Sequence, residues 1–425
     1  MPTVKSRLHR FLRWSEKYTK TDMVYLARAG FWSNLNFVIV SVFALLLSIA
    51  FANLLPRDTY GTYQYLIALS GIITALTLAG MNSAVIQSVA RGNEGDLRAT
   101  VRVQLLWSAV PTALGLVGAF YYWFAGNGMT AIGLAIVALL APIGNVYNTY
   151  QAFLTGKRDF KQLFVYTTLA AAAYYASMFV AMLFVKSAAF LVFVNLAVNT
   201  AVTFYAYRRT LAKYKPNDTT DQGTIPYGKH LSVMNAFGTA IAQLDSVLVF
   251  HFLGAADLAL YSFASLLPER VGGLFKFISS AALPKFSTQT HENIRGTILG
   301  KTLRAALAGV MATLLYMFFA PLLFRVLFPA YLDAVHYTIL YAAVIITLAA
   351  NLPATALVAQ QRKRELYVYN LVNPVILLAL QVPLLLSFGI AGILVARIIS
   401  NLFNILLALV LIWYPIGKRH TKQGA

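Results

Sequence analysis

The sequence of 425 residues contains no cysteine and few acids, 14 Asp and Glu against 34 Lys and Arg. The absence of cysteine excludes disulfides, thiol catalysis and cysteine-ligated metals. The six histidines are scattered, without the spacing of a metal site. No Walker-type phosphate loop occurs, so this chain does not itself use ATP. Since no Ser/His/Asp arrangement is recognisable either, we expect no enzyme, no cofactor and no metal.

Hydrophobic residues make up 59% of the chain and charged residues only 11%, which is not the balance of a soluble globular protein. One membrane span needs about 20 mainly apolar residues, and twelve such runs can be placed. This indicates an all-α integral membrane protein in which no soluble domain fits. The runs are 31–54, 63–90, 101–123, 129–154, 162–185, 187–207, 230–253, 257–283, 301–325, 335–360, 366–387 and 389–414.

The Lys and Arg residues alternate between the gaps that separate these runs. One set of gaps and the termini hold 28 of the 34, while the opposite gaps hold only Arg57, Lys186 and Arg325. The positive-inside rule then predicts twelve spans with both termini in the cytoplasm. The net charge of +20 fits this topology and contacts with anionic membrane lipids. Nucleic acid is not an expected partner, because no basic cluster lies in a folded soluble module.

The chain reads as a duplication of six spans. The turns at 55–63 and 253–261, which follow the first and seventh predicted spans, both begin with Leu and end with Tyr. Two halves of six spans have the same orientation and are related by a pseudo-two-fold axis along the membrane normal. We therefore expect two six-helix bundles. The predicted parts are a cytoplasmic amphipathic helix at 1–30, a first bundle at 31–207, a cytoplasmic linker at 208–229, a second bundle at 230–414 and a basic tail at 415–425.

Away from the span ends, five charged residues fall inside predicted spans: Asp245, Glu269, Arg270, Lys276 and Arg397. An isolated charge at mid-bilayer costs several kcal/mol, so each should face a partner or a wet cavity. In one interpretation, Asp245 pairs with Arg270 or with Arg397, which shares its depth, and the pair only ties helices together. In the other, Arg270, Lys276 and Arg397 line a central cavity and bind a diphosphate, with Asp245 and Glu269 as coupling or ion-pair residues.

Uncharged polar residues also recur within the predicted spans. Asparagine and glutamine side chains suit sugars, but they equally serve as hydrogen bonds between helices. We keep both interpretations for this set. Its members are Asn145, Asn148, Gln151, Asn370 and Asn373.

Short motifs in a fixed order resemble a known family. They include Leu55-Pro56 with Tyr60-Gly61-Thr62-Tyr63, Gln243-Leu244-Asp245, Leu283-Pro284-Lys285-Phe286-Ser287 and Phe388-Gly389-Ile390-Ala391-Gly392. Their order across the whole chain resembles the polysaccharide or O-antigen (Wzx-type) flippases of the multidrug/oligosaccharidyl-lipid/polysaccharide exporter superfamily. The resemblance implies two six-helix bundles that open alternately to each side of the cell inner (cytoplasmic) membrane.

The resemblance also implies a substrate and partners. The substrate is a polyprenyl-diphosphate-linked oligosaccharide, moved between leaflets for cell-surface polysaccharide biosynthesis. Partners are membrane lipids and, among proteins, the polysaccharide polymerase and glycosyltransferases, and we expect a monomer. The alternative is a proton- or sodium-coupled multidrug exporter of the same fold. Against it, the first six predicted spans contain no mid-span acid.

Overall fold

The computed structural model describes residues 23–414 except 276–278, 280–281, 284–285, 288 and 361. This described part is helical and contains no strand, as the sequence predicts. Most of the expected amphipathic helix at 1–30 and the whole tail at 415–425 lie outside the described residues. Residues 23–30 begin the first described helix, α2.

The chain divides into two compact units. The N-terminal unit comprises Met1–Leu54 and Leu69–Phe237, and the C-terminal unit comprises Leu55–Ala68 and Gly238–Ala425. Helices α3 and α11 each contribute residues to both units. The predicted linker 208–229 contains the end of α10 and the beginning of α11.

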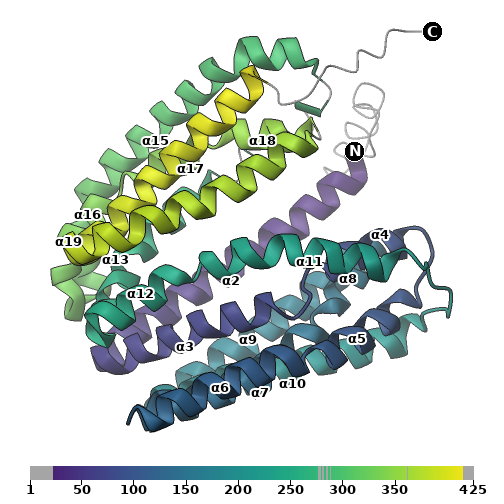
Figure 1. Cartoon of the computed structure of the whole chain (residues 1–425), viewed down its shortest axis with the longest axis horizontal. Coiled ribbons are helices and arrows are strands. Elements are labelled where there is room, and N and C mark those ends of the chain that lie inside the picture. Colours follow the sequence, from purple (N-terminus) through teal and green to yellow (C-terminus); the bar gives the residue numbers. More distant parts are fainter. Residues whose placement is uncertain are drawn as a thin grey trace, which may run out of the picture. The chain divides into compact units, whose positions relative to one another are not determined.

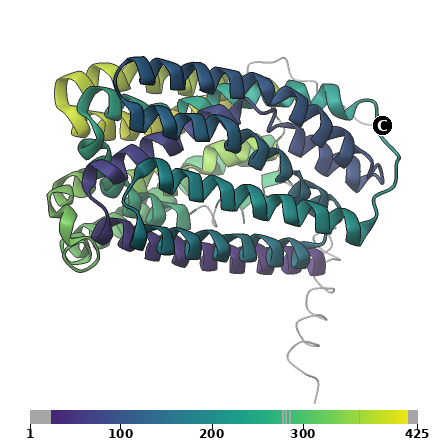
Figure 2. The ribbon, with the colours of Figure 1, turned by 90° about the horizontal axis from the view of Figure 1, so that it is seen from below.

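In the N-terminal unit, α7 packs against both α6 and α10, and α9 packs against α2 and α10. The long helices of this unit, coloured purple to teal, run along a common direction in both views (Figures 1 and 2). The helices are α2 (Met23–Leu54), α3 (Arg57–Ala75), α4 (Met81–Ala90), α5 (Asp96–Trp107), α6 (Ala109–Phe124), α7 (Gly128–Tyr147), α8 (Thr149–Gly156), α9 (Phe160–Phe184), α10 (Ala188–Tyr214) and α11 (Thr224–Ile241).

Local sequence signals set several helix ends in this unit. Asn127 and Asp159 are the N-caps of α7 and α9, and their side-chain oxygens accept hydrogen bonds from the backbone N–H groups of Thr130 and Gln162. Such caps satisfy donors that the first helical turn leaves unpaired. Helix α10 ends at Tyr214, and the left-handed backbone of the next residue, Lys215 (φ 42°), stops the helix.

In the C-terminal unit, α13 packs against α12, α16 and α17, and α19 packs against α12, α16, α17 and α18. Buried Ile294 and Ile298 of α15 pack in one apolar cluster with Ile405 and Leu409 of α19. The elements are α12 (Leu244–Leu253), α13 (Ala255–Leu274), α15 (His291–Leu327), the 3-10 helix η1 (Pro329–Ala334), α16 (Val335–Tyr341), α17 (Val344–Ala349), α18 (Leu352–Ala359) and α19 (Lys363–Trp413).

Gly389 divides α19 into two halves. Its backbone (φ 58°, ψ −135°) is outside the helical region, in a conformation that residues with a Cβ rarely adopt. A straight helix of 51 residues would be about 77 Å long, more than twice the ~30 Å hydrocarbon core. A hydrogen bond from Ser400 to Asn373, 3.0 Å long, joins the two halves.

The chain is a multi-pass membrane protein. Among the described residues, eight helices are long and apolar enough to cross a bilayer, or nine if the bent pair Pro329–Tyr341 and Val344–Ala359 is one span. The 50-residue run Arg364–Trp413 is one of these eight helices, although it contains two of the spans predicted from the sequence. The predicted span 63–90 is broken between α3 and α4, and the predicted span 257–283 runs into residues outside the description.

Candidate functional site

Charged and aromatic side chains from four helices of the C-terminal unit meet at one point. Asp245 lies in the first turn of α12, Glu269 in α13, Tyr341 at the end of α16 and Arg397 in the second half of α19. Three of them, Glu269, Tyr341 and Arg397, line a cavity of about 290 Å³. The cavity is lined by Ala242, Glu269, Tyr341, Val344, Leu348, Asn373, Leu377, Arg397, Ser400 and Asn401.

Arg397 is the centre of this cluster, because both terminal nitrogens of its guanidinium are occupied. Nη2 lies 2.8 Å from Oδ2 of Asp245, and Nη1 lies 2.5 Å from Oε1 of Glu269. Nη1 also donates to the hydroxyl of Tyr341 over 3.3 Å. The Arg397 side chain is 24% exposed, so part of it remains accessible at the cavity. One cation is thus shared by two carboxylates, and the cluster has a formal charge of −1.

Both carboxylate oxygens of Asp245 have partners within the protein. Its side chain is only 4% exposed. The Tyr261 hydroxyl donates to Oδ2, and the backbone N–H of Ser246 donates to Oδ1 over 2.8 Å. Buried carboxylates are stable as ions only when they are paired and hydrogen-bonded in this way. Asp245 is therefore a counter-ion of Arg397, one of the two partners considered for it from the sequence.

Glu269 differs from Asp245 in its exposure. Its side chain is 46% exposed, and the Tyr341 hydroxyl donates to Oε1 over 3.1 Å. Glu269 directly follows Pro268 within α13, where the missing backbone N–H interrupts the helical hydrogen-bond ladder. One turn later, the side chain of Leu348 in α17 occupies the space that a Cβ on Gly272 would need. This glycine therefore permits the close approach of α13 and α17.

The other two predicted diphosphate ligands are not seen at this cavity. Successive helical residues point about 100° apart, so Glu269 and Arg270 lie on different faces of α13. Arg270 is exposed, is absent from the cavity lining and has no ion pair within the described part of the chain. Lys276 lies outside the described residues.

The polar residues predicted for sugar binding are distributed over both units. Asn373 lines the cavity and accepts the hydrogen bond from Ser400, whereas Asn370 is exposed. The remaining three lie in the N-terminal unit. There Asn145 donates to Thr77 over 2.5 Å, and Gln151 donates to Asn148 over 3.1 Å. These three therefore use part of their hydrogen-bonding capacity within the protein.

Sequence reasoning missed the two tyrosines of the cluster, Tyr261 and Tyr341. Both are buried, 3% and 1% exposed. Buried tyrosine hydroxyls usually find a partner, and a tyrosine in an apolar span near a charged residue is a usable signal.

A second buried acid, which the sequence did not predict, lies in the N-terminal unit. Asp96 at the beginning of α5 is 1% exposed. Its Oδ2 accepts hydrogen bonds from the Ser88 hydroxyl, the Thr224 hydroxyl (2.9 Å) and the backbone N–H of Asp221 (3.2 Å). No cation pairs with it among the described residues. Asp96 thus holds the segment before α11 against α4 and α5.

Neither acid belongs to a metal site that the described residues reveal. Within residues 23–414 and outside the gaps named above, no group of three or more His, Asp or Glu could hold a metal ion. The cluster around Arg397 can bind an anion, and Arg397 can exchange one anionic partner for another. A guanidinium binds carboxylates and phosphates through the same paired N–H donors.

Comparison with known proteins places the chain in a family. A family model described as polysaccharide biosynthesis protein matches residues 50–304. The chain belongs to the polysaccharide biosynthesis protein family. The family resemblance expected from the sequence motifs is confirmed. A comparison of this family member with curated protein sequences finds no match.

Solved structures show the fold of this polysaccharide biosynthesis family protein. The lipid II flippase MurJ, in an inward closed conformation, gives a TM-score of 0.70 at 12% identity, over 89% of this chain and 87% of that chain. An inward-facing multidrug resistance MATE family transporter of the MOP superfamily gives 0.67 at 12% identity, over 88% and 94%. An outward-facing MATE family transporter gives 0.66 at 11% identity, over 92% and 94%. At these identities the likeness concerns the fold alone.

Proposed function

We propose that this protein flips a polyprenyl-diphosphate-linked oligosaccharide across the cytoplasmic membrane by alternating access. Membership of the polysaccharide biosynthesis protein family supports a role in making surface polysaccharide. The shared fold supports transport, since one neighbour is named a lipid II flippase and MATE transporters appear in inward-facing and outward-facing forms. The observation that carries the proposal is a partly exposed guanidinium, that of Arg397, at a cavity within a membrane-embedded unit.

The proposal includes the topology predicted from the sequence. Twelve spans form two bundles related by a two-fold axis along the membrane normal, and both termini lie in the cytoplasm. The hydrogen bond from Trp413 Nε1 to the carbonyl of Arg295 supports this orientation. It brings the end of α19 beside the beginning of α15, two places that the positive-inside rule assigns to the cytoplasmic side.

Arg397 would bind the diphosphate by exchanging one carboxylate for a phosphate. Asp245 stays in place, because it is buried and hydrogen-bonded by Tyr261 and Ser246. Glu269 is half exposed and held by fewer contacts, so it is the carboxylate that leaves. A released Glu269 can then take up a proton, which couples its protonation to substrate binding. When the diphosphate leaves, Glu269 gives up that proton and returns to Arg397.

The size of the cavity limits what it holds. At about 290 Å³ it lies just below the ~300–1,000 Å³ range of sites for drug-sized ligands. It therefore accommodates the diphosphate and not the oligosaccharide. Exposed Arg270, together with Lys276, is proposed as a further diphosphate ligand. Asn145, Asn148, Gln151 and Asn370 are proposed sugar contacts, with Asn373 at the edge of the diphosphate cavity.

The test is reconstitution into liposomes with a fluorescent polyprenyl-diphosphate sugar. Arg397→Lys keeps the charge but loses the paired donors, and we expect it to lower the flipping rate at least tenfold. Glu269→Gln should still flip substrate, at a rate that no longer responds to a proton gradient. Arg325→Gln is the matched control, since Arg325 is exposed at the far end of α15. Normal, pH-dependent flipping by both Arg397→Lys and Glu269→Gln would refute the proposal.

A second candidate is a proton- or sodium-coupled multidrug exporter. The net charge of −1 at the cluster favours it, because such a site also attracts cations. Liposomes containing a cationic dye distinguish the two. An exporter should move the dye and leave the polyprenyl-diphosphate sugar in its leaflet, whereas a flippase should do the reverse.

A further inference from the structure

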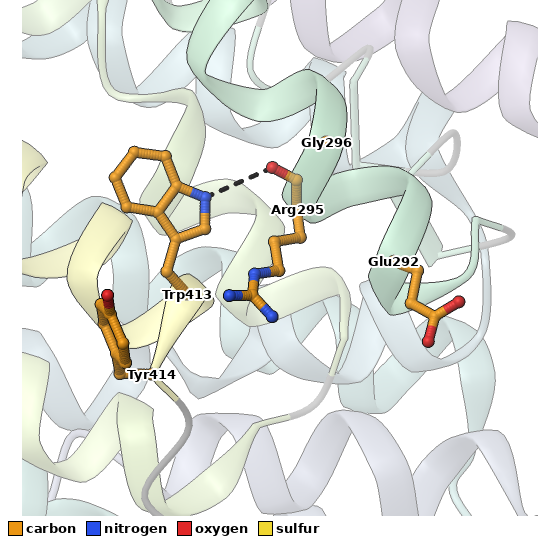
Figure 3. A pocket seen from close by; sticks show the side chains of 5 residues that line it. All are labelled: Glu292, Arg295, Gly296, Trp413 and Tyr414. Atoms are coloured by element: carbon orange, nitrogen blue, oxygen red, sulfur yellow. Dashed lines mark hydrogen bonds between the residues drawn. The ribbon is translucent and has the colours of Figure 1, made fainter.

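A second cavity lies at the other end of the C-terminal unit, away from the Arg397 cluster. It measures about 430 Å³ and is lined by Glu292, Arg295 and Gly296 of α15 with Trp413 and Tyr414 at the end of α19. Figure 3 shows Arg295 between Trp413 and Glu292, with the indole N–H directed at the Arg295 carbonyl. That hydrogen bond, 3.3 Å long, fixes the two helix ends to each other.

The cavity has one cation and one anion that are not paired with each other. Glu292 and Arg295 are both exposed, and no ion pair of either is found within the described residues. Their spacing of three positions puts them on one helix face, with about 5–6 Å between the Cβ atoms. A ligand that carries an anion and a cation about one helical turn apart can therefore satisfy both groups.

Two apolar stripes lead away from this cavity. On α15, Leu299, Leu303 and Leu307 follow Arg295 at intervals of four residues, and they are 41%, 60% and 64% exposed. On α19, Leu402, Leu406 and Val410 precede Tyr414 at the same interval and are about half exposed. Residues on neighbouring faces, Ile294 and Ile298 of α15 and Ile405 and Leu409 of α19, pack in one buried cluster. The two stripes therefore lie on the outer surface of two packed helices, where lipid chains can contact them.

Aromatic residues place the cavity at the depth of lipid headgroups. Trp413 and Tyr414 end the last apolar helix, and Tyr414 is 71% exposed. Tryptophan and tyrosine gather at the boundary between hydrocarbon and water. By the distribution of Lys and Arg, this is the cytoplasmic boundary. A lipid seated here would have its headgroup in the cavity and its acyl chains along the two stripes.

We infer that this cavity binds an ethanolamine phospholipid, whose headgroup carries a phosphate and a primary ammonium and no further charge. Arg295 binds the phosphate through its paired N–H donors, and Glu292 accepts hydrogen bonds from the ammonium. Trp413 and Tyr414 flank the headgroup. A choline headgroup has no N–H to donate, and a glycerol headgroup has no cation, so each satisfies only part of the site.

The experiment measures lipid retention by the purified full-length protein with native mass spectrometry. The probes are phosphatidylethanolamine, its N-methyl and N,N-dimethyl derivatives, phosphatidylcholine and phosphatidylglycerol, with identical acyl chains. The unmodified protein should retain phosphatidylethanolamine several-fold over phosphatidylcholine, with retention falling as methyl groups are added. Equal retention across this series overturns the inference without the use of any variant.

Variants then assign the two charges. Arg295→Gln should weaken retention of every phospholipid about fivefold, which corresponds to ~1 kcal/mol for one basic residue at a membrane surface. Glu292→Gln should abolish only the preference for ethanolamine over choline. Arg304→Gln, an exposed cation on α15 outside the cavity, is the control and should change neither. A preference that survives Glu292→Gln, or retention equally weakened by Arg304→Gln, overturns the inference. Soluble phosphoethanolamine should not compete, because it lacks the chains that the stripes hold.

Discussion

Arg397 and Asp245 form an ion pair of 2.8 Å between the second half of α19 and the first turn of α12, with the Asp245 side chain only 4% exposed. Breaking such a pair from one side leaves an uncompensated buried charge, which costs about 3–5 kcal/mol. We therefore predict that Arg397→Gln lowers thermal stability far more than Arg325→Gln. The measurement is the thermal midpoint of purified protein in detergent.

The matched double variant distinguishes an ion pair from packing alone. Asp245→Asn combined with Arg397→Gln removes both charges and should recover a large part of the stability that Arg397→Gln loses. A double variant whose losses simply add would show that the two side chains do not interact energetically. Recovery is expected to be incomplete, because Glu269 also binds Arg397.

A second prediction concerns Asp96, which accepts hydrogen bonds from Ser88, Thr224 and the backbone of Asp221. Asp96→Asn replaces one acceptor oxygen by a donor that faces other donors, and leaving buried donors unsatisfied costs about 1–3 kcal/mol. The thermal midpoint should fall, and protease should cut the segment before α11 sooner. Asp218→Asn is the control: Asp218 pairs with Arg98, but its side chain is 94% exposed, and exposed pairs contribute little. Equal effects of the two substitutions would contradict the role of Asp96.

The sequence predicted the helical membrane fold for a physical reason. The bilayer requires about 20 apolar residues per span and disfavours buried charge, so spans and their rare charges stand out. Asp245 and Arg397 lie at the same depth in their predicted spans, which is why the sequence offered them as a possible pair. The sequence did not predict that Glu269 would share the same cation. That depends on the rotation of α13, which is set by contacts such as Gly272 against Leu348.

Asp96 shows why the rest of the polar network could not be predicted. It lies beside Glu94 and Gly95 in a short polar stretch that resembles a solvated loop. Two of its three donors come from Asp221 and Thr224, which follow it by more than a hundred positions. No periodicity or spacing connects these segments, and only the packing of the chain brings them together.

A third prediction concerns pH and uses Asp159, the N-cap of α9, which lies between spans. Burial acts to raise the pKa of this carboxyl, but hydrogen bonds from Tyr214 and the Gln162 backbone, with Lys213 and Lys161 nearby, outweigh it and hold the pKa below its ordinary value. A lowered folded-state pKa contributes stability above the unfolded value of about 3.9 and loses it as the pH falls through the folded value. The loss should therefore begin below about pH 4.

Thermal midpoints at pH 6 and pH 3 test this assignment. Asp159→Asn keeps the capping oxygen but cannot titrate, so it should lose less stability on acidification than the unmodified protein. Asp218→Asn, which removes an exposed carboxylate, should follow the unmodified protein. The same acid sensitivity in Asp159→Asn as in the unmodified protein would show that Asp159 is not responsible.

The last prediction concerns the turn at Gly389 between the two halves of α19. Its φ of 58° and ψ of −135° lie in a region where a Cβ is strained, so Gly389→Ala should destabilise the protein by about 1–3 kcal/mol. Gly300→Ala is the matched control, because Gly300 is helical in α15 and a Cβ there meets nothing within 4 Å. Removing that glycine should stabilise the helix by up to ~1 kcal/mol. Opposite shifts of the two thermal midpoints are therefore expected. A neutral Gly389→Ala would mean that α19 continues through this position as a helix, and the hydrogen bond that joins Ser400 to Asn373 across the turn would then have to be abandoned.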